Sequence, residues 1–146
     1  PESWANHFEV VRRIQERTGG FTEFVPLPFV HMGAPIYLQG RARPGPTWDE
    51  TVLIHAVSRI AFDGLIPNIQ ASWVKVGMEG GLRLLEAGCN DLGGTLMNEI
   101  ISRAAGASHG QTLDAVAIEE AVRSIGRTPQ QRTTVYGAVA GVAAGG

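Results

Sequence analysis

Residues 87–109 read AGCNDLGGTLMNEIISRAAGASH, and this stretch predicts a strand that turns through glycine into a helix. The strand-like approach ends at residues 90–91, two glycines form the turn, and Thr95 can cap the helix. Such a junction gathers unpaired backbone N–H groups and the positive end of the helix dipole, which favours anions and polar ligands. An ordinary strand-to-helix turn that needs glycine for its backbone angles explains the same pattern.

The bulk composition narrows the class of protein. With 146 residues and an apolar fraction of 44%, the chain can form one domain with a sizeable core. The net charge of −2 argues against nucleic acid or an anionic membrane as the main partner. No apolar run reaches the roughly 18 residues that a membrane helix needs. A single cysteine excludes an internal disulfide and fits the cytoplasm.

Helices and strands alternate along the rest of the chain. Apolar residues at helical spacing, with glycine or proline at the ends, predict helices at about 3–17, 47–62, 74–87, 95–105 and 112–125. Alternating patterns predict strands at 21–27, 65–73 and 131–136, in addition to the approach to residue 91. Residues 31–46 form a long loop rich in glycine and proline, and loops of that length are often functional.

The faces of two helices follow from the same spacing. In the first helix Trp4, Phe8, Val11 and Ile14 are expected to face the core. Thr47 and Glu50 form a capping box at the start of the next helix. Its core face is expected to consist of Leu53, Ala56, Val57 and Ile60. His55 is expected at the surface of the same helix.

Four strands separated by helices imply parallel crossovers, so the expected fold class is α/β. Four such units make about half of a TIM-like barrel, because a whole barrel needs roughly 250 residues. We expect this half barrel to span residues 1–137, followed by a flexible glycine and alanine tail at 138–146. The open sheet edges predict pairing with a missing N-terminal half or self-association.

Polar residues gather at or after the carboxyl ends of these strands, where barrels of this kind have their active sites. Lys75 stands at a helix N-terminus, which disfavours a cation unless it faces a ligand, and Arg132 can clamp a carboxylate or phosphate. The candidate substrate-binding residues are Glu23, Gln70, Ser72, Lys75, Asn90, Asp91, Gly93, Gly94 and Arg132.

Simpler interpretations stand beside these. Glu23 suits a solvated carboxylate or a salt bridge, and Arg132 an ordinary surface arginine. Cys89 suits a small buried core residue better than a reactive thiol. His31 and His109 are weaker candidates because each can satisfy loop backbone groups. The histidines show no paired-ligand spacing, so no metal site is predicted.

Five stretches of this sequence resemble one enzyme family over residues 4–136. They resemble the C-terminal half of radical S-adenosylmethionine enzymes, and within these the CofH-type module of deazaflavin synthases (FbiC type). Menaquinone-pathway relatives of the futalosine cyclase type share the NDLGGT turn, whereas FTEFVPLPF and SWVK favour the deazaflavin branch. The stretches are GGFTEFVPLPFVH (19–31), RPGPT (43–47), IQASWVKVG (69–77), NDLGGTLMNEIISRAAGASHG (90–110) and QRTTVY (131–136).

The resemblance implies a transferase that couples a tyrosine-derived hydroxybenzyl group to 5-amino-6-ribitylaminouracil on the way to coenzyme F-420. It also implies S-adenosylmethionine and a [4Fe–4S] cluster bound through a CxxxCxxC motif. This chain departs from that motif because it holds only Cys89, so the chain alone is expected to be inactive. A non-catalytic half barrel that binds a ligand or assembles with a partner is the alternative from another class.

Overall fold

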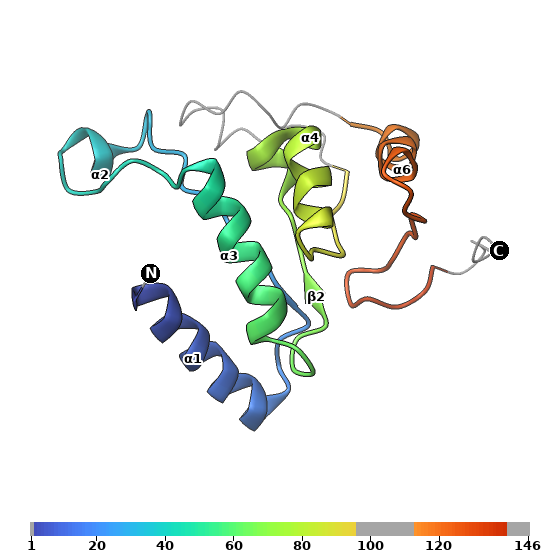
Figure 1. The fold of residues 1–146 in the computed structure, drawn as a ribbon, viewed down its shortest axis with the longest axis horizontal. Helices are drawn as coiled ribbons and strands as arrows, with labels where there is room; N and C mark the ends of the chain where they lie inside the picture. Colours follow the sequence, from blue (N-terminus) through green and yellow to red (C-terminus); the bar gives the residue numbers. More distant parts are fainter. Residues whose placement is uncertain (1, 96–112, 140–146) are drawn as a thin grey trace.

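The computed structural model describes residues 2–95 and 113–139. The longer helices α1, α3, α4 and α6 follow one another from left to right in Figure 1. The helix expected after Thr95 and most of the glycine and alanine tail lie outside the described residues. In chain order the elements are α1 (Glu2–Thr18), β1 (Glu23–Phe24), α2 (Pro35–Leu38), α3 (Trp48–Ala61), β2 (Asn68–Ile69), α4 (Trp73–Glu86) and α6 (Ala115–Ser124).

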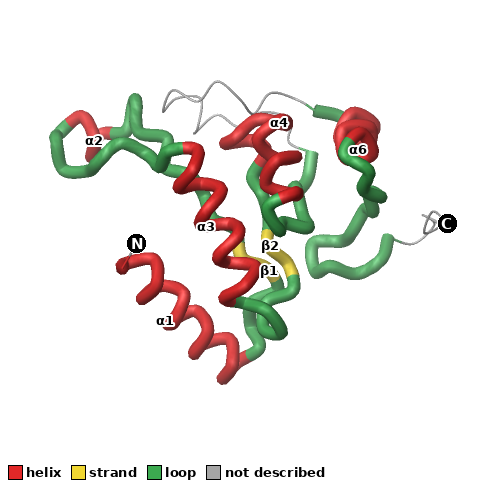
Figure 2. Tube along the Cα trace, in the orientation of Figure 1, coloured by secondary structure: helices red, strands yellow, loops and turns green. Residues whose placement is uncertain are grey.

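The sheet of the described chain is small and parallel. Strands β1 and β2 pair in parallel with Glu23 opposite Asn68, and Figure 2 shows both strands between α3 and α4. Immediately after β2, Gln70 forms a parallel bridge with Asp91. The Gln70 N–H donates to the Phe24 carbonyl at 3.0 Å, so three extended segments lie side by side. This arrangement confirms the α/β order of helices and parallel strands.

The predicted strands are longer than those observed. β1 ends at Phe24, shortly before Pro26 and Pro28, which have no N–H to donate to a neighbouring strand. Residues 131–136 are not a strand, and Arg132 instead forms an antiparallel bridge with Ala138. The described residues therefore contain a two-stranded sheet and a third bridged segment rather than four full strands.

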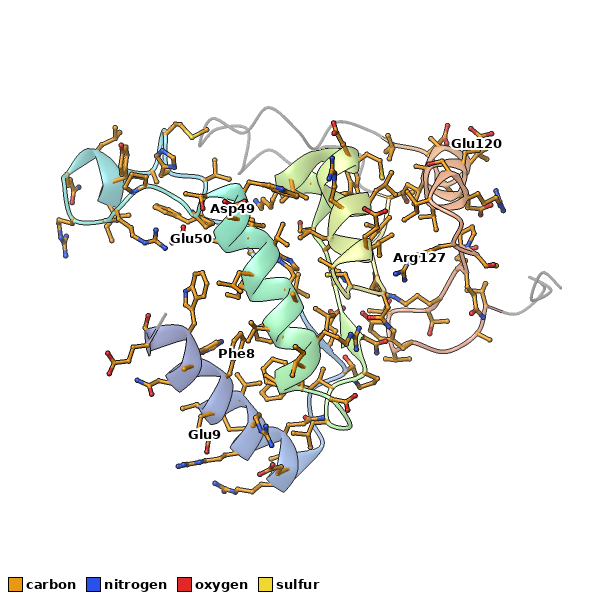
Figure 3. All side chains as sticks on the ribbon, viewed as in Figure 1. Phe8, Glu9, Asp49, Glu50, Glu120 and Arg127 are labelled. Carbon is orange, nitrogen blue, oxygen red and sulfur yellow. The ribbon has the colours of Figure 1, made fainter. Side chains whose placement is uncertain are left out.

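An aromatic cluster holds α1 and α3 against β1. The Phe8 and Phe62 rings meet edge to face at 5.4 Å, and the Phe24 and Phe62 rings are 4.7 Å apart. Figure 3 shows Phe8 between α1 and α3, whereas Glu9 lies on the outer side of α1. Such contacts add to the hydrophobic gain of burying Phe8 and Phe62 and of partly burying Phe24, so this cluster holds β1 in position.

The buried face of α3 is polar, which corrects the prediction. Thr51, His55 and Ser58 are the buried residues of this helix. The hydroxyl of Ser58 donates to the carbonyl of Ile54, and the hydroxyl of Thr51 donates one turn back in the same way, so neither needs a partner in the core. His55 is 1% exposed rather than at the surface.

Three of the four residues predicted for the core face of α3 are instead exposed. Leu53, Val57 and Ile60 each lie two residues after a buried position, a rotation of about 200° around the helix. They are 53%, 36% and 77% exposed. The prediction that they face the core is wrong, because the spacing alone identifies an apolar stripe without saying which side the sheet occupies.

The other helix faces match the predictions in part. On α1 Phe8 is buried as expected, but Ile14 is 40% exposed and Gln15 is buried instead. The Gln15 amide donates to the carbonyls of Phe21 and Leu65, which satisfies its polar atoms.

α4 bends at Gly77, whose φ of 74° lies in the left-handed region.

The long loop after β1 is tied down locally. It contains the short helix α2, and the His31 ring nitrogen Nδ1 accepts a hydrogen bond from the Gly45 N–H at 3.0 Å. A Cβ atom at Gly45 would lie 2.1 Å from the Phe29 carbonyl oxygen, so a side chain does not fit there. His31 therefore satisfies a loop backbone group, in agreement with the simpler interpretation.

The capping box of α3 yields a stability prediction. The Thr47 hydroxyl accepts from the Glu50 N–H at 3.2 Å, and the Glu50 carboxylate accepts from the Thr47 N–H at 2.9 Å. We expect Thr47→Ala to lower the free energy of unfolding by about 1 kcal/mol in urea denaturation. Thr128→Ala is the control at an exposed position, and equal stability of the two variants would contradict a role for the cap.

The burial of His55 yields a pH prediction. Burial lowers the pKa of His55 below its ordinary value of 6.5 in the folded chain. The unfolded chain therefore binds this proton first as the pH falls, and the stability contributed by neutral His55 is lost as the pH falls through 6.5. In denaturation between pH 7.5 and 5.5, His55→Gln should flatten the loss of stability and His7→Gln should retain it. The same slope in all three proteins would exclude His55 as the cause.

Candidate functional site

Three candidate residues meet because the extended segments are in register. Glu23 lies on β1, Gln70 follows β2, and Asp91 lies on the third segment, bridged to Gln70. The Gln70 side-chain amide donates to Glu23 Oε2 at 3.0 Å. The parallel pairing thus confirms that polar side chains from neighbouring strand ends come together.

Arg132 joins this cluster from the far end of the chain. Its Nε donates a short hydrogen bond to Asp91 Oδ2, and its Nη2 lies 3.8 Å from Glu23 Oε2. The Asp91 side chain is 6% exposed, and its second oxygen accepts from the Gly93 N–H. The hydrogen bond to Asp91 raises the pKa of Arg132 above its usual range. Arg132 is therefore not an ordinary surface arginine.

Tyr136 belongs to the cluster and was not predicted from the sequence. Its hydroxyl donates to Glu23 Oε2, and the Arg132 guanidinium lies 4.0 Å above its ring. Burial and the neighbouring carboxylates raise the pKa of Tyr136, so it stays a neutral donor. Its φ of 61° is an uncommon conformation for a large residue. The only signal in the sequence is its place in QRTTVY, one of the stretches that carry the family resemblance.

The two glycines of the turn have different surroundings. Gly93 has a φ of 79°, and a Cβ atom there would lie 3.1 Å from Gln70 Oε1. The absence of a side chain therefore allows the turn to approach Gln70. A Cβ atom at Gly94 would meet nothing within 4 Å, and the Gly94 carbonyl accepts from the Trp73 indole N–H at 3.1 Å.

Ser72 and Lys75 lie at the start of α4, two and five residues beyond Gln70. Ser72 is the N-cap residue, and its side chain makes no capping hydrogen bond. Its carbonyl accepts from the Lys75 N–H at 2.9 Å, which begins the helix. Both side chains are half-buried. The structure thus keeps them next to the strand end that carries Gln70.

Asn90 takes part in a different network from Asp91. Its Oδ1 accepts from the Ile69 N–H at 2.9 Å and from Arg59 Nη2 at 2.6 Å. Arg59 on α3 also donates through Nε to the Gly88 carbonyl at 2.7 Å. These contacts join the third segment to β2 and α3. In this structure Asn90 therefore positions the strand end.

A hollow of about 730 Å³ borders the cluster. Its lining includes Asp91, Gly94, Arg132 and Tyr136, together with residues of α6 and of the segment that follows it. Glu119 of α6 also lines this hollow. A hollow of this size suits a small organic molecule, and its polar groups include carboxylate, guanidinium, phenol, amide and hydroxyl groups. The arrangement can therefore orient a polar ligand through hydrogen bonds and charge.

The residues present do not fit an iron–sulfur cluster. Such a cluster requires three or four cysteine thiolates. Cys89 is 1% exposed, and burial raises the pKa of its thiol to about 12, which makes it a core residue as expected. Within residues 2–95 and 113–139, no three His, Cys, Asp or Glu side chains lie together in a way that could hold a metal ion. In the same ranges, no helix is long and apolar enough to cross a membrane.

Short parallel strands joined by helices, with polar side chains meeting at their carboxyl ends, define part of a parallel α/β protein. Residues 18–143 match the family model described as the CofH/MqnC C-terminal region. The chain belongs to this family, in agreement with the resemblance seen in its sequence.

Curated relatives carry informative names. A 5-amino-6-(D-ribitylamino)uracil--L-tyrosine 4-hydroxyphenyl transferase of Methanopyrus kandleri is 58% identical over 136 residues, which are 93% of this chain and 37% of that protein. An FO synthase of Nocardia farcinica is 54% identical over 139 residues, which are 95% of this chain and 16% of that protein. A protein of Methanothermobacter thermautotrophicus with the same name as the Methanopyrus transferase is 54% identical over 136 residues, which are 93% of this chain and 37% of that protein. This chain thus spans well under half the length of these relatives.

The pair of Asp91 and Arg132 yields a prediction that does not depend on activity. Arg132→Gln leaves a buried carboxylate without its charged donor, so the free energy of unfolding should fall by about 2 kcal/mol. Asp91→Asn combined with Arg132→Gln should cost less than the sum of the two single changes. Arg123→Gln, which breaks an exposed pair with Glu119, should cost less than about 0.5 kcal/mol. If the loss of stability in the double variant equals the sum of the losses in the two single variants, the buried pair is not coupled.

Proposed function

We propose that this chain is the C-terminal, substrate-binding part of a radical S-adenosylmethionine transferase of the CofH type. The complete enzyme couples a tyrosine-derived hydroxybenzyl group to 5-amino-6-(D-ribitylamino)uracil in the biosynthesis of the deazaflavin of coenzyme F-420. Family membership over residues 18–143 and the printed names of the relatives support this proposal.

The observation that carries the proposal is the polar cluster at the carboxyl ends of the parallel segments. Both substrates have many hydrogen-bonding groups: an amino acid carries an ammonium and a carboxylate, and a ribitylaminouracil carries amides and hydroxyls. Glu23 accepts from Gln70 and Tyr136 through Oε2 and stays 37% exposed. The Glu23 carboxylate is therefore placed to accept a hydrogen bond from an N–H or O–H of a substrate. Arg132 and Tyr136 hold this carboxylate in its orientation.

Cofactor binding is assigned to another part of the enzyme. The family resemblance implies S-adenosylmethionine and a [4Fe–4S] cluster, but the only cysteine of this chain is buried and protonated. We therefore place the cluster thiolates in the portion of the full-length protein that this chain does not include. The same portion is proposed to pair with the edge of β1 that has no partner strand among residues 2–95 and 113–139, with self-association of this chain as the alternative.

The main alternative function comes from the family description itself, which also names the MqnC branch. Enzymes of the menaquinone pathway are expected to act on different substrates through the same fold. A second alternative is a part that binds a ligand without taking part in catalysis. Identification of the product by mass spectrometry separates the first alternative, and substitutions in the cluster separate the second.

The decisive experiment uses the full-length protein that contains this chain, purified and reconstituted without oxygen. Glu23→Gln keeps the size and the hydrogen bond from Gln70 but removes the charge. We expect it to lower the tyrosine-dependent yield of the ribitylaminouracil adduct at least tenfold, with unfolding and iron content unchanged. Glu9→Gln is the matched control, because Glu9 lies on the exposed side of α1, where it pairs with Arg13.

The outcomes separate the alternatives. No adduct from the unaltered protein, together with conversion of a futalosine-type substrate, would move the chain to the menaquinone branch. Adduct formation at the unaltered rate in Glu23→Gln would reject the assigned role of the cluster while leaving the family assignment in place.

A further inference from the structure

The residues that follow α6 form one wall of the hollow beside the polar cluster. Residues 127–132 all line this hollow, and every one of them except Pro129 carries a side-chain hydrogen-bond donor. The apolar residues Leu85 and Leu92 line the hollow as well. The donor-bearing residues, named here the donor wall, are Arg127, Thr128, Gln130, Gln131 and Arg132.

The end of α6 fixes the position of Arg127. Gly126 has a φ of 73°, and its N–H donates to the Arg123 carbonyl at 2.9 Å. The Arg127 N–H donates to the Val122 carbonyl at 3.3 Å. These two hydrogen bonds form a Schellman motif, in which the chain turns sharply at a glycine after the helix. In Figure 3 Arg127 lies on the side of this segment that faces α4. The helix end therefore turns Arg127 toward the hollow that it lines.

The charges around the hollow leave Arg127 without a counter-ion. Asp91 pairs with Arg132, and Glu119 pairs with Arg123, so both carboxylates on the described lining already have a cationic partner. Within residues 2–95 and 113–139, the Arg127 guanidinium makes neither an ion pair nor a hydrogen bond. The described lining thus carries one positive charge that no acid balances, which attracts an anion.

The donor wall limits the class of anion. A guanidinium binds a carboxylate through two parallel N–H···O hydrogen bonds. One uncompensated positive charge balances one carboxylate, whereas a phosphate dianion would need a second cation. The hydroxyl of Thr128 and the side-chain amides of Gln130 and Gln131 add donors without adding charge. The hollow therefore suits a ligand with a single carboxylate.

We propose that Arg127 binds the carboxylate of the ligand that occupies this hollow, and that in the transferase this ligand is the amino-acid substrate. The identity of the ligand rests on the proposed function, because a ribitylaminouracil carries amides and hydroxyls but no carboxylate. Arg127 is thus a specificity-determining residue. It selects the amino acid over an amine of the same shape that has lost its carboxylate.

The test compares L-tyrosine with tyramine, which lacks the carboxylate, by titration calorimetry on the full-length protein that contains this chain. Arg127→Gln should weaken the binding of L-tyrosine about tenfold, the loss of a charge-assisted contact, and leave the binding of tyramine unchanged. Arg127→Lys keeps the charge without the paired donors and should recover part of the affinity for L-tyrosine. Arg17→Gln is the matched control, because Arg17 is an exposed arginine in the last turn of α1 and does not line the hollow.

Two results would overturn the role of Arg127. Equal weakening of both compounds in Arg127→Gln would show that Arg127 supports the site without recognising the carboxylate. Unchanged binding of L-tyrosine would show that Arg127 does not contact the ligand. In both cases adduct formation by the unaltered protein would keep the proposed function in place.

Failure of the proposed function has a different signature. An unaltered protein that forms no adduct and binds no L-tyrosine would remove that function, and the role of Arg127 with it. If Arg127→Gln fails to fold, the ratio of the affinities for L-tyrosine and tyramine in Arg127→Lys decides the question, because a ratio equal to that of the unaltered protein rejects recognition through paired donors.

Discussion

The architecture depends on the hydrogen bonds of Arg59. Strands of two residues contribute few ladder hydrogen bonds, so their register needs other support. The Arg59 guanidinium binds both the Gly88 carbonyl and the Asn90 side chain, which ties the third extended segment to α3. Gly88 permits this approach, because a Cβ atom there would lie 3.2 Å from the Arg59 side chain. As a result Gln70 stands opposite Asp91, and the polar cluster can form.

The polar cluster combines groups of opposite charge that are partly shielded from solvent. Two carboxylates, Glu23 and Asp91, converge on one guanidinium. Asp91 is almost fully buried and accepts a hydrogen bond from Arg132 Nε, whereas Glu23 is more open to solvent and pairs with Nη2 at 3.8 Å. Tyr136 adds a neutral donor to Glu23. One acid thus serves structure while the other keeps its charge accessible, which is an arrangement suited to holding a polar ligand in a fixed orientation.

The sequence predicted features that depend on local chemistry and missed those that depend on packing. The capping box of Thr47 needs only residues three apart, and it formed as expected. The polar strand ends were found because parallel strands bring their carboxyl ends to one edge. The buried face of α3 was missed, since an apolar stripe marks an amphipathic helix but not the side on which His55 meets the core. Tyr136 was missed because its contact with Glu23 spans 113 positions.

The position of Gly45 has a consequence for how this chain can vary between organisms. The loop after β1 is long and mostly exposed, and such loops usually tolerate substitution and insertion. Here the backbone at Gly45 lies directly against Phe29 and His31, with no room for even a methyl group. The two ends of the loop are therefore in contact at this one point. We expect the residues between these ends to tolerate substitution, whereas position 45 requires glycine.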